Sequence, residues 1–398
     1  MSSYVMVARA RASAIFYPGK QFSLNYQIPG KQPFQLLFRT TYQNRGFDEP
    51  VPIDLWVEAR GSAVSVDEAG ETFGNAALEI CTHLALTANA SMGHLEPHLI
   101  FDATPDANEH QFLQAFLPEE PVTVVPGRRI DVEVLQGFVI ALAKHPERQR
   151  LSNATVQYVE ALRYWRRGNE IRCLAHLYMG IDAVTKAVLC EHQRTTGKTE
   201  DQLAEEWGAS DPDKLKRRKK LEGQARRRLI FKSDLNCEEK AREVSNQFEH
   251  GWSAFGTMRA PAEEIVGKTA GYLRRAILET SGLQASLLDR ALDHQYSVPR
   301  GPLVLVRYVR GTLTGHVDKL APEGELYPSF RWHSGLEKVQ REANGTFQFT
   351  PKDTVTSQFG AGVTMTNLRY EVWDGTAIIE REPIEQPVMT SAASIKAD

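Results

Sequence analysis

The sequence lacks most of the short patterns that identify a chemistry. Its four cysteines, Cys81, Cys173, Cys190 and Cys237, form no C-x-x-C pair. This argues against zinc ribbons and dithiol redox sites and favours reduced, buried thiols. G-x-S-x-G and H-E-x-x-H are absent, and "GNAALEICTHL" has neither the second glycine nor the lysine of a phosphate loop. We therefore expect no metal and no cofactor.

Long apolar runs and an excess of one charge are also missing. No apolar run approaches the ~20 residues of a membrane-spanning helix. The first residues, "MSSYVMVARARASAIFYPGK", lack the basic and apolar segments of a signal peptide. Lys and Arg number 47 against 50 Asp and Glu, for a formal net charge of −3. We expect a cytoplasmic protein with no membrane partner, in which any nucleic-acid surface is a local patch.

The patterns that are present predict an α+β fold with two or three domains. The chain has 398 residues, of which 42% are hydrophobic, and this is more than one core usually serves. Residues 1–150 alternate apolar and polar in "YVMVARARASAIF", "PFQLLFRTTYQ" and "IDLWVEARGSAVSV", which predicts a β-rich N-terminal domain. Two helices are expected inside it, one over about 73–88 and one over "RIDVEVLQGFVIALAKH", which ends at the proline after His145.

Residues 151–293 are expected to form a helical bundle. In "SNATVQYVEALRYWRRG" the predicted N-cap is Ser152 or Asn153, and "NEIRCLAHLYMGIDAVTKAVLCEH" carries a continuous apolar stripe. Asn236 is the predicted cap of "CEEKAREVSNQFEH", and Pro261 is expected in the first turn of the next helix.

The end of the chain returns to strand patterns. Residues 297–383 contain "PLVLVRYVRGTLTG", "YPSFRWHSG", "NGTFQFT" and "GVTMTNLRYEVWDG", separated by Gly, Asn and Pro, and predict a β-rich C-terminal domain. Residues 384–398 are small and polar, and we expect them to be disordered.

The stretch "REVSNQFEHGW" carries the main candidate site. A helix advances 100° per residue, so Asn246 and His250 stack on one face, one turn apart. Arg242 lies one further turn back on the same stripe. Histidine moves protons near neutral pH, so this stripe is a candidate functional site.

A basic run precedes that stretch and supplies candidate phosphate contacts. Such runs attract phosphates in a salt-dependent, sequence-neutral way. The alternative is a solvated helix face paired with the acidic stretch "EDQLAEEW". The nine cations are Lys214, Lys216, Arg217, Arg218, Lys219, Lys220, Arg226, Arg227 and Arg228.

The helix order and the Asn246–His250 spacing resemble the HEPN superfamily of helical domains, and within it the ApeA-like branch. The resemblance covers residues 151–293: two long helices, the second carrying Asp182 before an apolar stretch, then the motif helix and a final helix, "TAGYLRRAIL". The family signature is Arg, then Asn, Asp or His, then three residues, then His. Ser245 stands at the arginine position.

The resemblance implies a metal-independent ribonuclease in which the RNA's own 2′-hydroxyl attacks the adjacent phosphate. His250 is then the acid or base, Asn246 orients the pair, and Arg242 or the basic run contacts the phosphate, while Asp182 supports the site. It also implies a homodimer or higher homo-oligomer, RNA as partner, and a role in prokaryotic antiviral defence.

Three other interpretations stay open. In a degenerate site the protein binds RNA or a nucleotide without cutting it. In an ordinary helix end, His250 complements the helix dipole, Gly251 is the left-handed cap and Asn246 bonds a neighbouring helix. In a non-catalytic scaffold, the bundle self-associates and the β domains bind a protein partner. Ser245 favours the scaffold, whereas the basic run and the intact Asn246–His250 pair favour RNA.

Overall fold

The computed structural model describes residues 2–43, 50–105, 109–115, 128–251, 254–302, 306–315, 320–324, 329–341, 347–373, 378–383 and 388–389. The fold is mixed α+β, as the sequence predicts. The chain forms two compact units, one of Met1–Tyr42 with Pro52–Pro302 and one of Gln43–Val51 with Leu303–Asp398. The division into three domains stays a prediction.

The first unit begins with a six-stranded sheet of order β3-β4-β5-β1-β6-β7. The central strand β1 is antiparallel to both β5 and β6, so Met6 lies between Ala59 and Ile100 and all three are buried. This period-two burial is the pattern that the alternation predicts. The strands are β1 (Ser2–Ala10), β3 (Phe22–Tyr26), β4 (Phe34–Gln43), β5 (Val51–Ala63), β6 (Glu96–Asp102) and β7 (Phe112–Gln114). β2 (Ala14–Ile15) and β8 (Arg128–Arg129) form a separate parallel pair.

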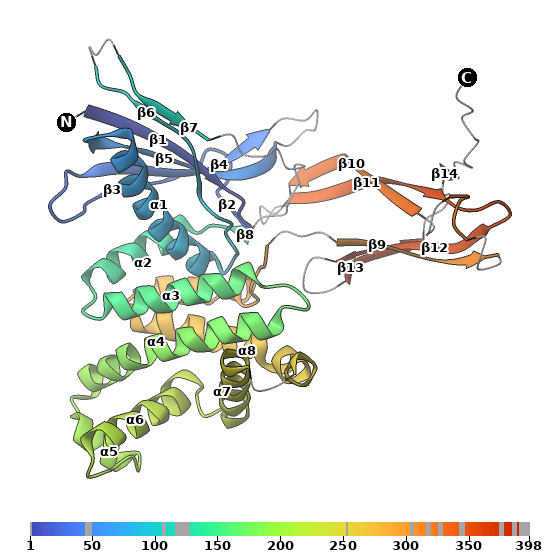
Figure 1. Ribbon diagram of the computed structural model, residues 1–398. Coiled ribbons are helices and arrows are strands. Elements are labelled where there is room, and N and C mark those ends of the chain that lie inside the picture. The colour runs from blue at the N-terminus through green and yellow to red at the C-terminus, as the bar shows by residue number, and fades with distance from the viewer. Residues whose placement is uncertain are drawn as a thin grey trace. The chain divides into compact units, whose positions relative to one another are not determined.

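Helix α1 (Val66–Ala88) packs against β1 and β6 (Figure 1). It begins seven residues before the predicted start at Phe73. The Ser65 side chain accepts a hydrogen bond from the Glu68 amide, and the Glu68 carboxylate accepts one from the Val64 amide. The prediction missed this Ser-x-x-Glu signal, which starts a helix by satisfying its first free N–H groups.

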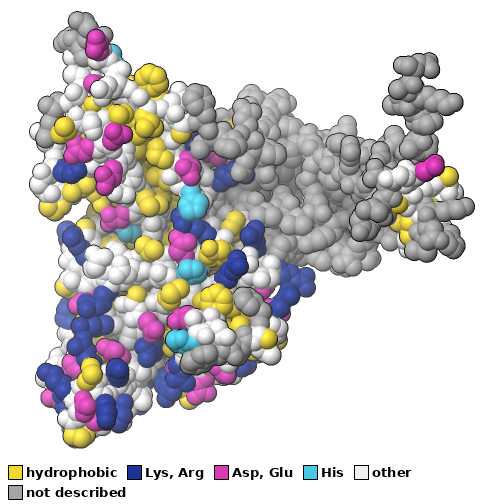
Figure 2. All heavy atoms as spheres, in the orientation of Figure 1, with side chains coloured by type: hydrophobic (Ala, Val, Ile, Leu, Met, Phe, Trp, Pro, Cys, Tyr) yellow, Lys and Arg dark blue, Asp and Glu magenta, His cyan; other side chains and the backbone are white. Residues whose placement is uncertain are grey.

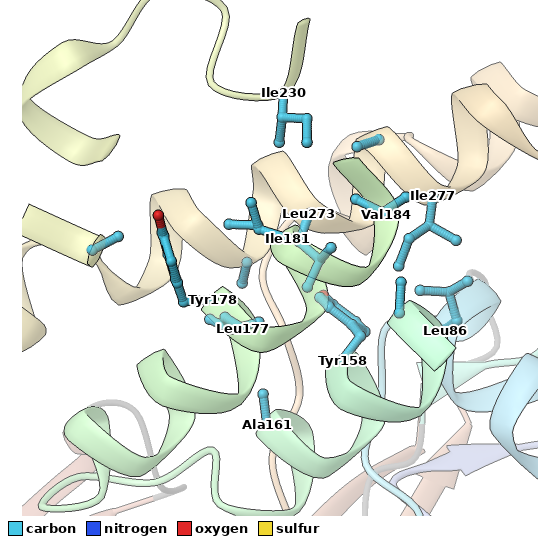
Figure 3. Packing of buried hydrophobic residues seen from close by; sticks show 14 of the residues in the cluster. Leu86, Tyr158, Ala161, Leu177, Tyr178, Ile181, Val184, Ile230, Leu273 and Ile277 are labelled. Carbon is cyan, nitrogen blue, oxygen red and sulfur yellow. The ribbon is translucent and has the colours of Figure 1, made fainter. Parts of the chain in front are cut away.

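The helical region is built on α3 (Arg148–Arg163) and α4 (Glu170–Thr196), which lie side by side (Figure 1). Their apolar faces meet α8 (Phe255–Thr280) in one core. Figure 3 shows Tyr158 of α3, Ile181 of α4 and Leu273 of α8 pointing into it. The other helices are α2 (Val132–Lys144), α5 (Glu200–Glu206), α6 (Lys214–Ala225), the π-helical turn η1 (Arg226–Ile230), α7 (Leu235–His250), α9 (Ala285–Ala291) and the 3-10 turn η2 (His294–Tyr296).

Several predicted helix boundaries are wrong because tertiary packing extends the helices. The first residue of α3 is Arg148, so Ser152 and Asn153 lie inside the helix and not at its cap. Asp234, not Asn236, caps α7 and accepts a hydrogen bond from the Cys237 amide. Pro261 lies inside α8, six residues after its first residue. α2 ends at Lys144, before the His145-Pro146 pair, as predicted.

Helix α4 is long and apolar enough to cross a membrane by length and composition. Of its most apolar 18-residue window, 67% is buried inside the structure. A core helix of this length meets the same criterion, so the finding is weak evidence for a membrane span.

Arg274 on α8 ties four segments together in the interior. Its guanidinium is almost fully buried and donates to the carbonyl oxygens of Leu86 (2.9 Å), Thr87 (2.8 Å), Ala291 (2.7 Å) and Tyr296 (3.5 Å). These carbonyls belong to the end of α1, the end of α9 and η2, where helices leave acceptors unsatisfied. The carbonyl partners supply the polar environment that a buried cation requires.

The second unit contains two three-stranded sheets, of order β10-β11-β14 and β13-β12-β9. The predicted strand-rich character of this part is confirmed, with β9 (Val306–Thr314), β10 (Ser329–Arg341), β11 (Phe347–Gln358), β12 (Thr364–Trp373) and β13 (Ile378–Pro383). Within the predicted disordered tail, Val388–Met389 forms the short strand β14 beside β11. The rest of that tail lies outside the described residues.

Candidate functional site

The candidate site lies on α7, whose C-terminal end is closed as the ordinary helix-end interpretation expects. Gly251 has φ +65°, and its amide donates to the carbonyls of Gln247 and Phe248. A left-handed residue of this kind is the usual cap of a helix, and glycine adopts it without steric cost. His250 occupies the last helical position, where a cation complements the helix dipole.

Asn246 and His250 are both exposed on this helix. The Asn246 side chain makes no hydrogen bond to another described residue, so the expected bond to a neighbouring helix is not found. Two exposed polar side chains one turn apart present a donor, an acceptor and an imidazole to the same region of solvent.

Ser245, the residue before Asn246, faces into the bundle. It is fully buried, and its hydroxyl donates to Glu249 Oε1 at 2.8 Å. An arginine at this position would have to carry its charge into the packed interior or displace the helix, and either costs several kcal/mol. The local packing of α7 is therefore compatible with serine and not with the arginine of the family signature.

Arg242 shares the exposed face but is directed away from His250. Its Nη1 lies 3.5 Å from Glu238 Oε1, one turn toward the helix N-terminus. Helical side chains lean in that direction, so a residue two turns before His250 points away from it. Glu238 is 2% exposed and also pairs with Arg227 at 3.3 Å. The prediction that Arg242 contacts the same phosphate as His250 has no support from this conformation.

The turn η1 brings two arginines of the basic run against neighbouring helices. Arg226 Nη1 donates to Asp182 Oδ1 of α4 at 2.8 Å, while Arg227 reaches Glu238 of α7. A π-turn widens the helix by one residue, and such turns occur frequently at functional sites. The predicted supporting residue Asp182 is therefore held by the basic run.

The charges of this cluster converge on α4 beside α7. Burial raises the pKa of Asp182, Arg226 lowers it, and Glu249, the neighbour of His250, raises it. Burial also raises the pKa of Tyr178 to about 12, with opposing contributions from nearby arginines and carboxylates. The structure thus places Asp182, Arg226 and the last turn of α7 within electrostatic range of one another.

The rest of the basic run is divided between paired and free cations. Arg217 pairs with Asp201 at 2.9 Å, Arg218 with Glu222 at 3.3 Å and Lys220 with Asp211 at 2.9 Å. Among the ion pairs of the described residues, the Arg217–Asp201 pair is the one that joins the run to the upstream acidic stretch. Figure 2 shows dark blue Lys and Arg side chains over the α5 and α6 end of the helical region, with magenta Asp and Glu between them. The exposed cations that form no ion pair with a described residue are Lys214, Lys216, Lys219 and Arg228.

Sequence reasoning missed Glu238 and Glu249 as members of this cluster. Both lie on the α7 face that also carries Ser245, at spacings of seven and four residues from it. Their spacing from Ser245 was a readable signal. The contact of Glu238 with Arg227 of η1 could not be assigned without the tertiary structure.

The described residues offer no converging set of metal ligands. No three His, Cys, Asp or Glu side chains in this part of the chain lie close enough to hold one ion. His94 and His98 are four residues apart in the sequence, a spacing that could chelate a metal on a helix, but His98 belongs to strand β6. The exposed side chains of α7 can transfer protons and make electrostatic contacts.

Comparison with known proteins adds no assignment to this geometry. No protein-family model, no curated protein and no solved structure matches the chain.

Proposed function

We propose that this protein binds RNA through its helical region, as the HEPN-like hypothesis expects. Two observations carry the proposal: Asn246 and His250 are exposed one turn apart on α7, and α6 carries exposed lysines without ion-pair partners among the described residues. Lys214, Lys216 and Lys219 lie on α6 without ion-pair partners among the described residues. Cations of this kind attract phosphates whatever the base sequence.

Salt dependence tests this proposal directly. The measurement is fluorescence anisotropy of a labelled single-stranded 30-mer RNA between 50 and 200 mM KCl. Three to four phosphate contacts predict a slope of log affinity against log salt of about −2 to −3, which is about a 20- to 50-fold loss over this range. Lys216→Gln with Lys219→Gln should flatten the slope by about 1.4. The matched control changes two exposed lysines elsewhere, Lys20→Gln with Lys144→Gln, and should leave it unchanged.

Cleavage is a second candidate function, favoured by the exposed imidazole of His250 beside the Asn246 amide. In this reaction the RNA 2′-hydroxyl attacks the adjacent phosphorus, the 5′-oxygen leaves, and His250 transfers the proton. The products are a 2′,3′-cyclic phosphate and a 5′-hydroxyl. Loss of a positioned acid or base slows such a step by about 10²–10⁴-fold.

The cleavage test is incubation of the protein with mixed cellular RNA in EDTA. The wild type should produce cyclic-phosphate ends, and His250→Ala should not. The control His110→Ala removes another exposed histidine and should produce these ends as the wild type does. RNA binding without any cleavage by the wild type would leave a binder with a degenerate site.

The non-catalytic scaffold is the interpretation that would replace both RNA binding and RNA cleavage. If the folded wild type shows no affinity for RNA at 50 mM KCl, the function belongs to self-association or to a protein partner of the β-rich parts. The homodimer, the cytoplasmic location and the antiviral role stay predictions, and light scattering of the purified protein tests the first of them.

A further inference from the structure

The turn between α3 and α4 carries a stack of planar side chains that the proposed site does not use. Tyr164 caps α3 and lies against His176 of α4, with ring centroids 5.6 Å apart and planes only 8° from parallel. The guanidinium carbon of Arg172 lies 5.9 Å from the Tyr164 ring centroid. Arg172 is the exposed member of this group, and the two rings are half-buried.

The stack is held in place before any ligand arrives. His176 Nδ1 lies 3.0 Å from Gln157 Oε1 of α3, which fixes the orientation of the imidazole. Tyr164 also packs against the main helical core. Rings fixed in this way lose little conformational entropy on binding, so they make an efficient contact for another planar group.

The same turn carries cations without counter-charges. Arg166, Arg167 and Arg172 are exposed, and none of them forms an ion pair with a described residue. Glu170 is the one carboxylate between Tyr164 and His176, and its Oε1 accepts a hydrogen bond from the Gly168 amide at 2.7 Å. We call Tyr164, Arg166, Arg167, Arg172 and His176 the α3–α4 turn surface.

A ligand that fits this surface has flat rings and regularly spaced negative charges. Bases that are not paired stack on Tyr, His and Arg planes, while arginines bind the phosphates between them. A duplex does not offer this contact, because its bases are already stacked on one another. An acidic peptide would satisfy the arginines and leave the parallel ring stack without a role.

The Glu170 carboxylate of this turn also acts on helix α8, which follows α7 in the chain. Glu170 acts on Arg259 of α8, whose pKa is raised by its hydrogen bond and ion pair with Glu263 and further by Glu170. Arg259 lies nine residues after His250, in the first turns of the helix that follows α7.

We propose that the α3–α4 turn surface binds single-stranded RNA, with unpaired bases stacking on the Arg172–Tyr164–His176 group and phosphates contacting Arg166 and Arg167. This inference deepens the proposed RNA binding and rests on it. It adds the substrate class, an unpaired strand, and places a second contact region away from α6.

The test measures anisotropy of fluorescein-labelled oligo(U) of 12 nucleotides and of a 12-base-pair RNA duplex at 100 mM KCl. Tyr164→Leu removes one stacking plane and should weaken oligo(U) binding about tenfold, within the range for single stacking contacts. Tyr164→Phe keeps the ring and should bind like the wild type. Far-UV circular dichroism of each variant confirms that the helices remain.

Arg166→Gln with Arg167→Gln tests the phosphate contacts without changing the packed core. Their loss should make the salt slope less steep by about 1.4. The control, Arg60→Gln with Arg194→Gln, removes two exposed arginines that are already paired with Glu58 and Glu191, and should leave the slope as in the wild type.

The outcomes separate this inference from the proposed function. If the wild type binds oligo(U) and the α6 lysine variant weakens binding, but the turn variants bind normally, the α3–α4 turn surface is refuted and RNA binding stands. Equal affinity for the duplex overturns the single-strand assignment. No affinity of the wild type for either RNA overturns both proposals.

Discussion

Replacement of Arg274 by methionine tests whether its hydrogen bonds to buried carbonyls stabilise the fold. Methionine fills a similar volume but donates no hydrogen bonds, so the carbonyls of Thr87 and Ala291 lose donors at 2.8 and 2.7 Å. Leu86 keeps a hydrogen bond from the Asn89 amide. A buried acceptor left unsatisfied costs about 1–3 kcal/mol. Two such acceptors predict that the free energy of unfolding falls by about 2–6 kcal/mol.

An opposing effect has to be weighed against this loss. Burial lowers the pKa of Arg274 to about 10, which shows that the interior disfavours its charge. Replacing Arg274 also removes the cost of burying its charge, but it leaves neutral backbone carbonyls buried without donors. Because these carbonyls stay buried in the variant, we expect the lost hydrogen bonds to lower the free energy of unfolding by more than the removed charge raises it.

The assay is urea unfolding followed by circular dichroism at 222 nm, because every described helix belongs to the first unit. The matched control is Arg275→Met on the next residue, which is half-exposed and pairs with Glu279 at 3.6 Å. A surface pair of this kind contributes less than about 1 kcal/mol. If Arg274→Met and Arg275→Met unfold at the same urea concentration, the carbonyl network does not stabilise the fold as argued.

Two further predictions use the same assay. Burial lowers the pKa of His83 to about 4, opposed by Glu79, so this imidazole is neutral in the folded protein while the unfolded chain takes up a proton near pH 6.5. The free energy of unfolding should therefore fall as pH drops through this window, by about 2 kcal/mol from pH 7 to pH 5, and His83→Leu should remove that part of the decrease. Gly251→Ala places a Cβ at φ +65° and should destabilise the protein by about 1 kcal/mol. Gly267 lies within α8, where a new Cβ would meet no neighbouring side chain or segment within 4 Å, so Gly267→Ala should stabilise the protein by about 0.5–1 kcal/mol. Equal effects of the two alanines would contradict the role of Gly251 as the left-handed cap of α7.

Much of the architecture followed from local periodicity. The alternation around Met6 predicted a strand, and the apolar stripe of "NEIRCLAHLYMGIDAVTKAVLCEH" predicted the long core helix α4. Helix starts were less predictable, because packing extends a helix past the first good cap. This is why α3 begins before Ser152 and α8 before Pro261.

The candidate site was predictable in part. The 100° turn per residue placed Asn246 and His250 on one face, and both side chains are exposed there. The same geometry put Arg242 on the stripe but said nothing of Glu238, which draws its guanidinium away from His250. It also gave no sign that Ser245 faces the core, since burial depends on which helices surround α7.

The sequence by itself therefore determined what depends on neighbours along the chain: the α+β class, the order of strand-rich and helix-rich parts, and the spacing of the α7 stripe. Only the tertiary structure decided what depends on distant segments: which cations of the basic run are neutralised, the union of Arg226 with Asp182, and the enclosure of Arg274 by the ends of α1 and α9. The physical reason is that hydrogen bonds within helices and strands follow from local pattern, whereas ion pairs and buried polar contacts form between residues that only packing brings together.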